Sequence, residues 1–548
     1  MKADLVIYGK IYTSNAKHEY AKAAAVKDGR YVYVGDDEGV KEYIEEGKTK
    51  IFDRRGNGII MAGGTEGHGH YIMNGFLEFM NFAVTGSTID EVVANTRKYV
   101  EAHPDYEVYY TFGWDNVAIA AAKETADVRT KFDEICPDKP MLICDNSGHN
   151  GFANSLALKE AGITAETKIH GGTIAKDARG NLLGWLSETA YNLCLKKSIA
   201  TRTMVMPKDY EGVAKSMEDR LHSWGYTNYQ DGWTNYFGTN AMDVLNEIDN
   251  TRGLTVNVGG SYKIDVFDDW KEEITALEGY SKQYHGKHFN FDTVKLFADG
   301  EAVESKTGWL LNGYVDGSHG TQVWDTKVFN DIVKAANSKG LSMHVHTQGD
   351  GASQQAVDAF IAAEPTAAPG IFNGIVHTRN ILEETKDKMA AHNCYTATNI
   401  NWRTLIKASD ADKVPYALSD DCARNGYPVK SMIDRGIVLC SSTDVPAAAG
   451  APTDVPGIIE VAVNDSRPDY EVYEMNPAER ISIEQAMDVF TINGAKLLRI
   501  DKERGSVEVG KYADFICLCK DITAIPKTEI HSAIVDTVYF EGKEVYVK

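Results

Sequence analysis

The chain has 548 residues, which exceeds the size of one ordinary hydrophobic core and predicts one large domain with a second, smaller one. Its formal net charge of −22 disfavours binding to nucleic acid or to an anionic membrane surface. Eight cysteines without a Cys-x-x-Cys pair indicate free thiols, and no apolar run approaches the length of a membrane span, so we expect a cytoplasmic protein without a membrane partner.

Both ends of the chain predict short antiparallel strands. Up to about Phe52, apolar and polar residues alternate in runs that are separated by turn residues such as Asp28-Gly29, and the end of the chain repeats this pattern. We expect one small β-sandwich domain, built from residues 1–58 and 496–548. The expected strands are 5–8, 11–12, 23–26 and 31–34 near the start, and 514–518, 535–540 and 545–547 near the end.

The tripeptide His68-Gly69-His70 is the most informative motif of the chain. It follows the apolar run Gly58-Ile59-Ile60-Met61, and residues i and i+2 of an extended strand point to the same side. Two imidazoles at the end of a strand can therefore bind one metal ion, and imidazole is a common zinc ligand. A complete metal site needs further ligands from distant segments.

The middle of the chain alternates predicted strands with predicted helices. One helix is expected over 326–339, with Asp325 as its N-cap and Gly340 as its stop, and another over 352–363. Repeated βα units favour a parallel sheet, and about eight strands favour closure into a (β/α)8 TIM barrel over residues 59–495. The predicted strands are 226–231, 254–258, 293–297, 341–346, 374–377 and 436–441.

A long segment interrupts this alternation. About 155 residues separate His70 from Tyr226, far more than a βα connection needs. We therefore expect a large insertion after the first barrel strand, with an inserted subdomain over about 75–205. Segments that follow the carboxyl end of a barrel strand lie over the active site, so this subdomain is predicted to form a lid and part of the substrate pocket.

Six side chains able to bind a cation follow or occupy five of the expected strands. A single histidine at a strand end is most often structural, but the joint pattern predicts a metal centre, because barrel strands bring their carboxyl ends together. His344 points the same way one layer deeper and is not expected to be a ligand. The six candidates are His68, His70, Lys295, His346, His377 and Asp444.

These motifs resemble the amidohydrolase superfamily, specifically the YtcJ-like branch of amidohydrolase family 3. The likeness extends over nearly the whole chain, and the ordered set of motifs is specific. The chain departs from the usual pattern at Ala62 and Val376, and at three positions near the predicted mouth, Glu66, Gln348 and Gly351. The matching segments are 61–70, 146–149, 154–158, 184–188, 294–300, 346–352, 442–446, 493–495 and 505–514.

The resemblance implies a metal-dependent hydrolase that cleaves a carbon–nitrogen bond in an amide or cyclic amide of a small molecule. His68 and His70 would hold one divalent ion, expected to be zinc, and His346 and His377 would hold a second. Lys295 would bridge the ions as a carbamate formed with carbon dioxide, after burial beside the cations has removed its proton. The metal would acidify a bound water to form the nucleophile.

Further roles follow from the same resemblance. Asp444 would accept the proton of the water and return it to the leaving nitrogen, and His149 on the insertion is the candidate donor to the substrate carbonyl. Asp231 could orient a ligand histidine, although a turn role is equally compatible with its position. The candidates for contact with the substrate are Trp114, Glu188 and Trp309.

Other functions stay open at this point. A deaminase or an esterase on the same scaffold would use the same residues, because one fold supports many chemistries. A non-catalytic protein that binds a small molecule is a further alternative. A homodimer is expected from the resemblance alone.

Overall fold

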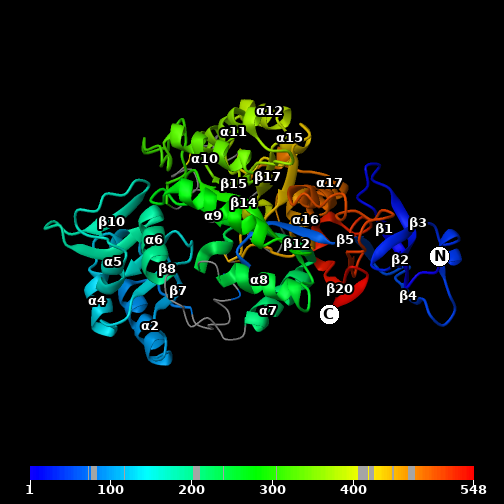
Figure 1. Cartoon of the computed structure of the whole chain (residues 1–548), viewed down its shortest axis with the longest axis horizontal. Coiled ribbons are helices and arrows are strands. Elements are labelled where there is room, and N and C mark those ends of the chain that lie inside the picture. Colours follow the sequence, from blue (N-terminus) through cyan, green and yellow to red (C-terminus); the bar gives the residue numbers. More distant parts are fainter. Residues whose placement is uncertain are drawn as a thin grey trace.

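In the computed structural model, the described residues form three sheets. Figure 1 shows the barrel in the middle, a sheet from the inserted segment (cyan) on one side, and a sheet built from the two ends of the chain (blue and red) on the other. The structure describes every residue except 72, 74, 76–82, 117, 201–209, 238–239, 304, 405–417, 419–424, 447–449 and 467–474.

Eight parallel strands form the barrel sheet, and this confirms the predicted barrel. Each expected strand of the middle region overlaps an observed one, although β13 begins at Asn257 rather than Leu254. Strand β17 was not predicted, because its run Tyr-Thr-Ala-Thr is short and only half apolar. In spatial order the strands are β6 Gly64–Gly69, β12 Tyr226–Asp231, β13 Asn257–Lys263, β14 Phe289–Phe297, β15 Ser342–Thr347, β16 Gly374–His377, β17 Tyr395–Thr398 and β18 Val438–Ser441.

Hydrogen bonds from the segment after β18 join the last strand to the first. The backbone N–H of Asp444 donates to the carbonyl oxygen of His68 at 2.9 Å. The Oε1 atom of Glu66 accepts from the backbone N–H groups of His68 at 3.1 Å and Thr443 at 2.8 Å. These bonds hold the carboxyl ends of β6 and β18 side by side, and so bring His70 and Asp444 to one place.

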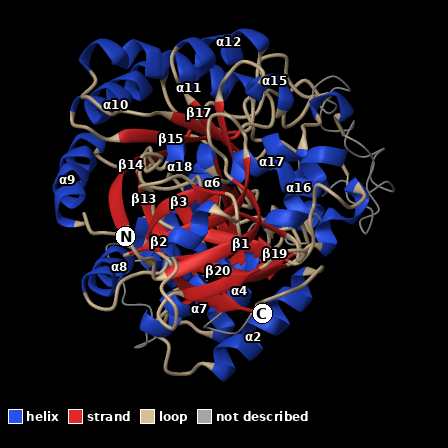
Figure 2. Cartoon of the chain, turned by 90° about the vertical axis from the view of Figure 1, so that its right-hand side faces the viewer, coloured by secondary structure: helices blue, strands red, loops and turns tan. Residues whose placement is uncertain are grey.

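Helices cover the outside of the barrel, as Figure 2 shows. Asp325 is the N-cap of α10 as predicted, and its Oδ1 accepts from the N–H groups of Lys327 and Val328 at 3.0 and 3.1 Å. The chain turns away from this helix at Gly340, whose φ of +84° suits glycine. The helices are α7 Tyr210–Trp224, α8 Asn240–Asn250, α9 Trp270–Gln283, α10 Thr326–Ser338, α11 Asp350–Ala363, α12 Glu383–Ala391, α15 Lys430–Ile433, α16 Val455–Asn464, α17 Ile483–Phe490 and α18 Ile492–Leu497.

Both ends of the chain contribute to one eight-stranded sheet. The link is the antiparallel pair of β5 and β19, in which Ala62 lies opposite Phe515. The expected boundary at residue 58 would assign β5 to the barrel, and the domain limits given above stay a prediction. The strands are β1 Leu5–Tyr12, β2 Tyr20–Lys27, β3 Arg30–Gly35, β4 Lys50–Asp53, β5 Ile59–Ala62, β19 Phe515–Leu518, β20 Val535–Phe540 and β21 Lys543–Val547.

The segment between β6 and β12 carries a five-stranded sheet of its own. Its strands are β7 Tyr109–Trp114, β8 Met141–Asp145, β9 Asn150–Ala153, β10 Gly172–Lys176 and β11 Leu182–Ser187. Its helices are α2 Ile89–Ala102, α3 Ala120–Lys123, α4 Val128–Ile135, α5 Ser155–Glu160 and α6 Glu188–Cys194. Within the described residues, no helix combines the length and the apolar character that crossing a membrane requires.

Candidate metal centre

Three of the six candidate ligands lie within reach of a single ion. The ligand atoms of His68, His377 and Asp444 all lie within 4.8 Å of one another, and the three residues are buried. Nε2 of His68 is 3.4 Å from Oδ1 of Asp444, and Nδ1 of His377 is 4.0 Å from Oδ2 of the same carboxylate. His68 belongs to β6, His377 ends β16 and Asp444 follows β18, so residues far apart in the sequence meet at one rim of the barrel.

The other three candidates surround this group. Nε2 of His70 lies 3.1 Å from Oδ1 of Asp444, and Nζ of Lys295 lies 3.2 Å from Nε2 of His68. The ring of His346 is 4.4 Å from the ring of His377. The structure therefore brings together all six side chains, while their roles as ligands stay a prediction.

The chemistry of this cluster fits a divalent cation. Nδ1 of His70 and Nδ1 of His346 are buried and have no hydrogen-bond partner in the described part of the chain. Since buried polar atoms are nearly always paired, two unpaired imidazole nitrogens in this cluster indicate lone pairs kept for an ion. Imidazole and carboxylate donors suit zinc and similar metals.

Burial lowers the pKa of two basic groups of the cluster, His377 and Lys295. It lowers the pKa of His377 to about 4, although the Asp444 carboxylate opposes this shift, so the imidazole is neutral at working pH. Burial also lowers the pKa of Lys295 to about 7, helped by Lys263 and opposed by Asp444 and Asp231. A large share of Lys295 is therefore a free amine at neutral pH, which is the form that reacts with carbon dioxide.

Contacts behind the cluster orient the rings. Nδ1 of His377 lies 2.8 Å from Oδ1 of Asn399, which follows β17. Nδ1 of His68 lies 2.8 Å from Nε2 of His344, and Nδ1 of that second histidine lies 2.7 Å from the hydroxyl of Tyr395. His344 therefore supports His68 from one layer below. The sequence did not predict a role for Tyr395, which lies in β17, or for Asn399, which follows it, because β17 itself was not predicted.

Strained backbone marks the same place. His377 has a φ of 68°, Asp444 one of 58° and Glu188 one of 50°. Residues other than glycine rarely adopt this left-handed conformation, and its cost is tolerated mostly at functional sites. These three residues are among those that the sequence assigns to chemistry, and other residues with this conformation lie elsewhere in the described chain.

The inserted segment reaches the cluster through an ion pair. Nδ1 of His149 lies 2.8 Å from Oε2 of Glu188, while Oε1 of Glu188 accepts from the hydroxyl of Thr307 at 2.8 Å. The ring of His149 is 6.0 Å from the ring of His346. Burial alone would lower the pKa of His149, but the charges of Glu188 and Asp145 raise it to about 9. His149 is therefore protonated at neutral pH and can act as a donor.

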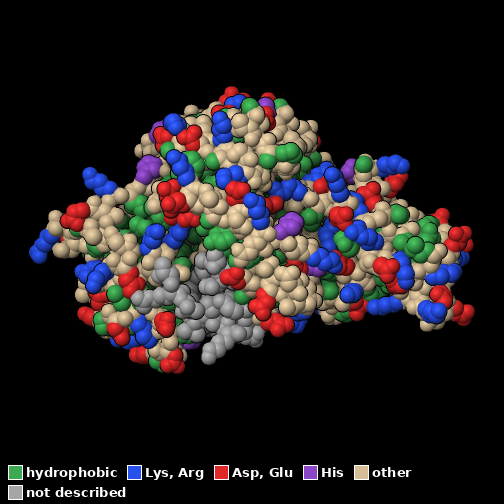
Figure 3. Space-filling model, in the orientation of Figure 1, with side chains coloured by type: hydrophobic (Ala, Val, Ile, Leu, Met, Phe, Trp, Pro, Cys, Tyr) green, Lys and Arg blue, Asp and Glu red, His purple; other side chains and the backbone are tan. Residues whose placement is uncertain are grey.

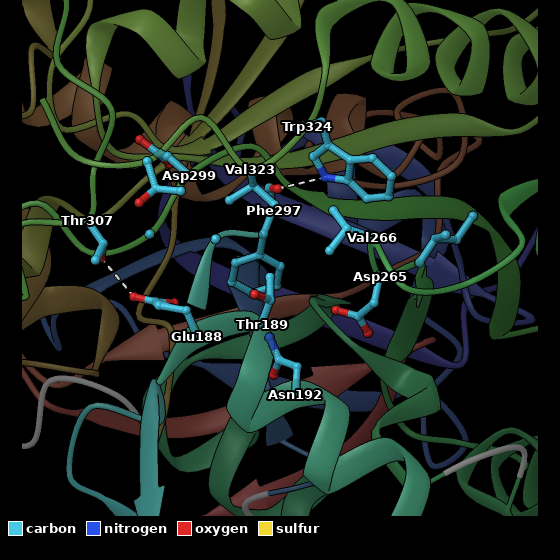
Figure 4. A pocket seen from close by; sticks show the side chains of 14 residues that line it. Glu188, Thr189, Asn192, Asp265, Val266, Phe297, Asp299, Thr307, Val323 and Trp324 are labelled. Carbon is cyan, nitrogen blue, oxygen red and sulfur yellow. Dashed lines mark hydrogen bonds between the residues drawn. The ribbon is translucent and has the colours of Figure 1, made fainter. Parts of the chain in front are cut away.

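An open groove of about 690 Å³ leads to this ion pair. Its lining comes from the inserted segment, at 170–173 and 187–188, and from the loop after β14, at 307, 320–322 and 324–325. A small cavity of about 20 Å³ adjoins it, and Glu188 and Thr307 line both. Figure 4 shows this cavity with the hydrogen bond between Thr307 and Glu188. The groove lies within the size range of small-molecule sites.

The remaining candidates lie in well-packed surroundings. The buried indole of Trp114 donates from Nε1 to the carbonyl oxygen of Ile143 at 2.9 Å inside the five-stranded sheet. The backbone N–H of Trp309 donates to Asp299 at 2.9 Å. Oδ1 of Asp231 accepts from the N–H of Trp233 at 3.1 Å, which is a turn contact. For Trp114 and Trp309 contact with the substrate stays a prediction, as does the orienting role of Asp231.

Three departures from the family pattern turn out to be structural. Glu66 is buried and binds the backbone at the barrel closure described above. Oε1 of Gln348 accepts from the N–H of Ala302 at 2.9 Å. A Cβ atom at Gly351 would lie 2.8 Å from Cδ2 of Trp309, so the indole occupies the space that a side chain would need. These three residues therefore affect the packing at the predicted mouth of the barrel, where they differ from the family pattern.

Comparison with known proteins agrees with this geometry. N-substituted formamide deformylase of Arthrobacter pascens is 22% identical, over 99% of this chain and 98% of its own. YtcJ of Bacillus subtilis is 25% identical over 98% of each chain. An uncharacterized metal-dependent hydrolase from Pyrococcus horikoshii OT3 has the same fold, with a TM-score of 0.73 at 21% identity over 95% of this chain and 99% of that one. The amidohydrolase family model matches residues 56–546, and the chain therefore belongs to the amidohydrolase family.

Proposed function

We propose that this protein is a metal-dependent hydrolase that cleaves the carbon–nitrogen bond of an amide or cyclic amide in a small molecule. The observation that carries this proposal is the meeting of His68, His377 and Asp444 within 4.8 Å, with Lys295 beside them. The relative from Arthrobacter pascens is named for removing a formyl group from N-substituted formamides, which is an amide hydrolysis. Deamination or ester hydrolysis on the same scaffold is the second candidate, and a non-catalytic binding protein the third.

The metal site would use all six clustered side chains. His68 and His70 would hold one ion and His346 and His377 a second, with Asp444 beside the first and Lys295 between them as a carbamate. We propose zinc, because its preferred ligands match this set. When bound, the metal supplies a Lewis acid that activates water and polarises the substrate carbonyl.

The protein's own residues would then move the protons. Asp444 is buried, and its carboxylate faces the imidazoles of His68 and His70 at 3.4 and 3.1 Å. Burial would raise the pKa of Asp444, but the neighbouring His377 and His68 hold it well below its usual range, so the group is a carboxylate anion at neutral pH. Protonated His149, whose ring centre lies 6.0 Å from that of His346, would donate to the developing oxyanion.

We expect Asp444→Asn to keep its metal and to lose about 10²- to 10⁴-fold in kcat, because asparagine cannot carry the proton. Metal content by elemental analysis and kcat on the same preparation measure the two effects separately. Asp434→Asn, at a surface ion pair with Lys430, is the matched control and should behave like the wild type. Full activity of the Asp444→Asn enzyme would exclude this residue as the proton carrier.

We expect Glu188→Gln to move the alkaline limit of activity downward. In the wild type, the charge on His149 is present below pH about 9 and is lost as the pH rises through that value. Without the Glu188 carboxylate, burial dominates and the imidazole loses its proton at a lower pH. The pH profile of kcat/KM measures the shift. The control is Thr307→Val, which removes the hydrogen bond from Thr307 to Glu188 but keeps the charge of Glu188. The pH profile of this control should match that of the wild type. If the alkaline limit of Glu188→Gln does not move, the donor role of His149 is contradicted.

A panel of substrates tests the function as a whole. Metal-loaded enzyme would be incubated with N-formyl and N-acetyl amides, cyclic amides, esters and amino-heterocycles, and the released amine, acid or ammonia measured. Turnover of the amides supports the proposal. Ammonia from the heterocycles alone would indicate a deaminase, and no turnover with bound metal would favour a binding protein.

The surroundings of the enzyme are part of the proposal. A net charge of −22 disfavours nucleic acid, and Figure 3 shows acidic and basic side chains interspersed over the described part of one face, without a basic patch. We propose a cytoplasmic enzyme that acts as a homodimer. Sedimentation analysis of the purified protein measures its oligomeric state.

A further inference from the structure

One buried cation beside the metal centre has no role in the chemistry above. Arg379 lies on the loop after β16, two residues beyond His377, and only 2% of it is exposed. Its Nε and Nη2 atoms are buried and have no hydrogen-bond partner among the described residues. A guanidinium is always charged, and a buried charge without a partner is costly, so this position calls for an anion.

The nearest aromatic neighbour does not supply that anion. The guanidinium carbon of Arg379 lies 5.2 Å from the ring centre of Tyr427, and the backbone N–H of Tyr427 donates to the carbonyl oxygen of Arg379 at 2.9 Å. The ring gives a cation–π contact and its hydroxyl a hydrogen-bond contact with the guanidinium, but burial raises the pKa of the phenol, which is therefore neutral. Tyr427 therefore holds the arginine in place without balancing its charge.

Two carboxylates whose charges act on Tyr427 are engaged elsewhere. Asp444 faces the histidines of the cluster. Glu301 accepts from the backbone N–H groups of Val303 at 2.6 Å and Ser305 at 2.7 Å. Both carboxylates are therefore bound to other groups of the protein, and the edge of Arg379 that carries Nε and Nη2 has no anionic partner among the described residues.

A second unmatched donor lies beside the metal cluster. The indole of Trp402 stacks on His377 with 5.5 Å between ring centres and 13° between planes, and its edge meets the ring of Tyr427 at 6.3 Å. Nε1 of Trp402 is buried and, like the arginine nitrogens, is without a partner in the described structure. The loops after β16 and β17 thus present three free N–H donors next to a candidate metal ligand.

We propose that Arg379 binds a carboxylate of the substrate, which makes the substrates small acids that carry the scissile amide, such as N-acyl amino acids. This inference rests on the proposed function. Nε and Nη2 lie on one edge of the guanidinium, and that edge forms two parallel N–H···O bonds with a carboxylate. Trp402, which stacks on His377, would donate to the same acid from Nε1. The carboxylate anchors the substrate, and the amide then faces the metal cluster.

Matched substrates test this assignment. N-Acetyl-L-phenylalanine and N-acetyl-L-phenylalaninamide differ only in carboxylate against carboxamide, and the wild type should favour the acid. Arg379→Met should lower kcat/KM for the acid by about 10- to 100-fold, mainly through KM, and change the carboxamide by less than about twofold. Arg379→Lys keeps the positive charge, and its kcat/KM for the acid should lie between those of the wild type and of Arg379→Met. Arg435→Met, at an exposed ion pair with Glu383 and Asp387, is the control for a lost arginine and should match the wild type.

A binding measurement separates this inference from the proposed hydrolysis. Calorimetry with metal-loaded Asp444→Asn protein would compare the same two compounds before and after the additional Arg379→Met substitution. Binding of the acid that depends on Arg379 supports the inference even if no compound is hydrolysed. Equal losses for acid and carboxamide in Arg379→Met, no preference for the acid in the wild type, or no binding of either compound would overturn it. Amide hydrolysis without any acid preference would leave the proposed function intact and remove only the role of Arg379.

Discussion

Replacing His68 with alanine is expected to abolish metal binding and to reduce kcat/KM by more than about 10³-fold, because the metal supplies several kcal/mol of transition-state stabilisation. His68 has close contacts with two other members of the cluster. Its Nε2 lies 3.4 Å from Asp444 and 3.2 Å from Lys295, and its Nδ1 is supported by His344. Elemental analysis and steady-state kinetics on the same preparation measure both losses.

Two further variants make this result specific. His68 is fully buried beside the barrel closure, so its loss can also weaken the fold. His70→Ala removes a partly exposed histidine of the same cluster and should lose metal with little change in thermal unfolding. His392→Ala removes a histidine that pairs with Glu364 on the surface and should keep metal and activity. Retention of metal and activity in both His68→Ala and His70→Ala would end the assignment of these residues as ligands.

Replacing Lys295 with alanine is expected to lower activity by about 10²- to 10⁴-fold, because the bridging ligand that we propose it forms would contribute several kcal/mol of stabilisation. Burial lowers the pKa of Lys295 to about 7, so near neutral pH the amine can form a carbamate with carbon dioxide. Bicarbonate with a short carboxylic acid should restore part of the lost activity, because the acid can occupy the space of the missing side chain. A carbamate signal from labelled bicarbonate in the carbon NMR spectrum of the wild type measures the modification itself.

A second buried lysine provides the control for this experiment. Lys386 on α12 is also buried, and it is paired with Glu383 at 2.6 Å on the outer side of the barrel. Lys386→Ala should keep its activity and should not respond to bicarbonate and acid. Wild-type turnover of the Lys295→Ala enzyme without any additive would rule out a bridging carbamate.

Periodicity and spacing were enough for most of the barrel and for the six clustered residues. Strand β16, Gly374–His377, and the N-cap of α10, Asp325, were predicted to the residue. Each candidate ligand follows or occupies an apolar run, and the geometry of parallel strands requires that such positions share one rim. Short, polar β17 gave no comparable signal, and with it the sequence analysis missed Asn399, the partner of His377.

Contacts between distant segments decided the rest. Trp114 is buried in the sheet of the inserted segment, whereas Glu188 is paired with His149 at the groove. These different positions depend on how the inserted segment folds against the barrel, and no local sequence pattern encodes that placement. Arg379 shows the same limit most clearly. In the sequence it is one polar residue in a loop, and only its burial without a hydrogen-bonding partner for two nitrogens marks it as a site for an anion. Residue order and hydrophobic spacing therefore specified which elements form and which side chains end the strands. The environment of each side chain, on which charge and hydrogen bonding depend, arose only when the separate parts packed together.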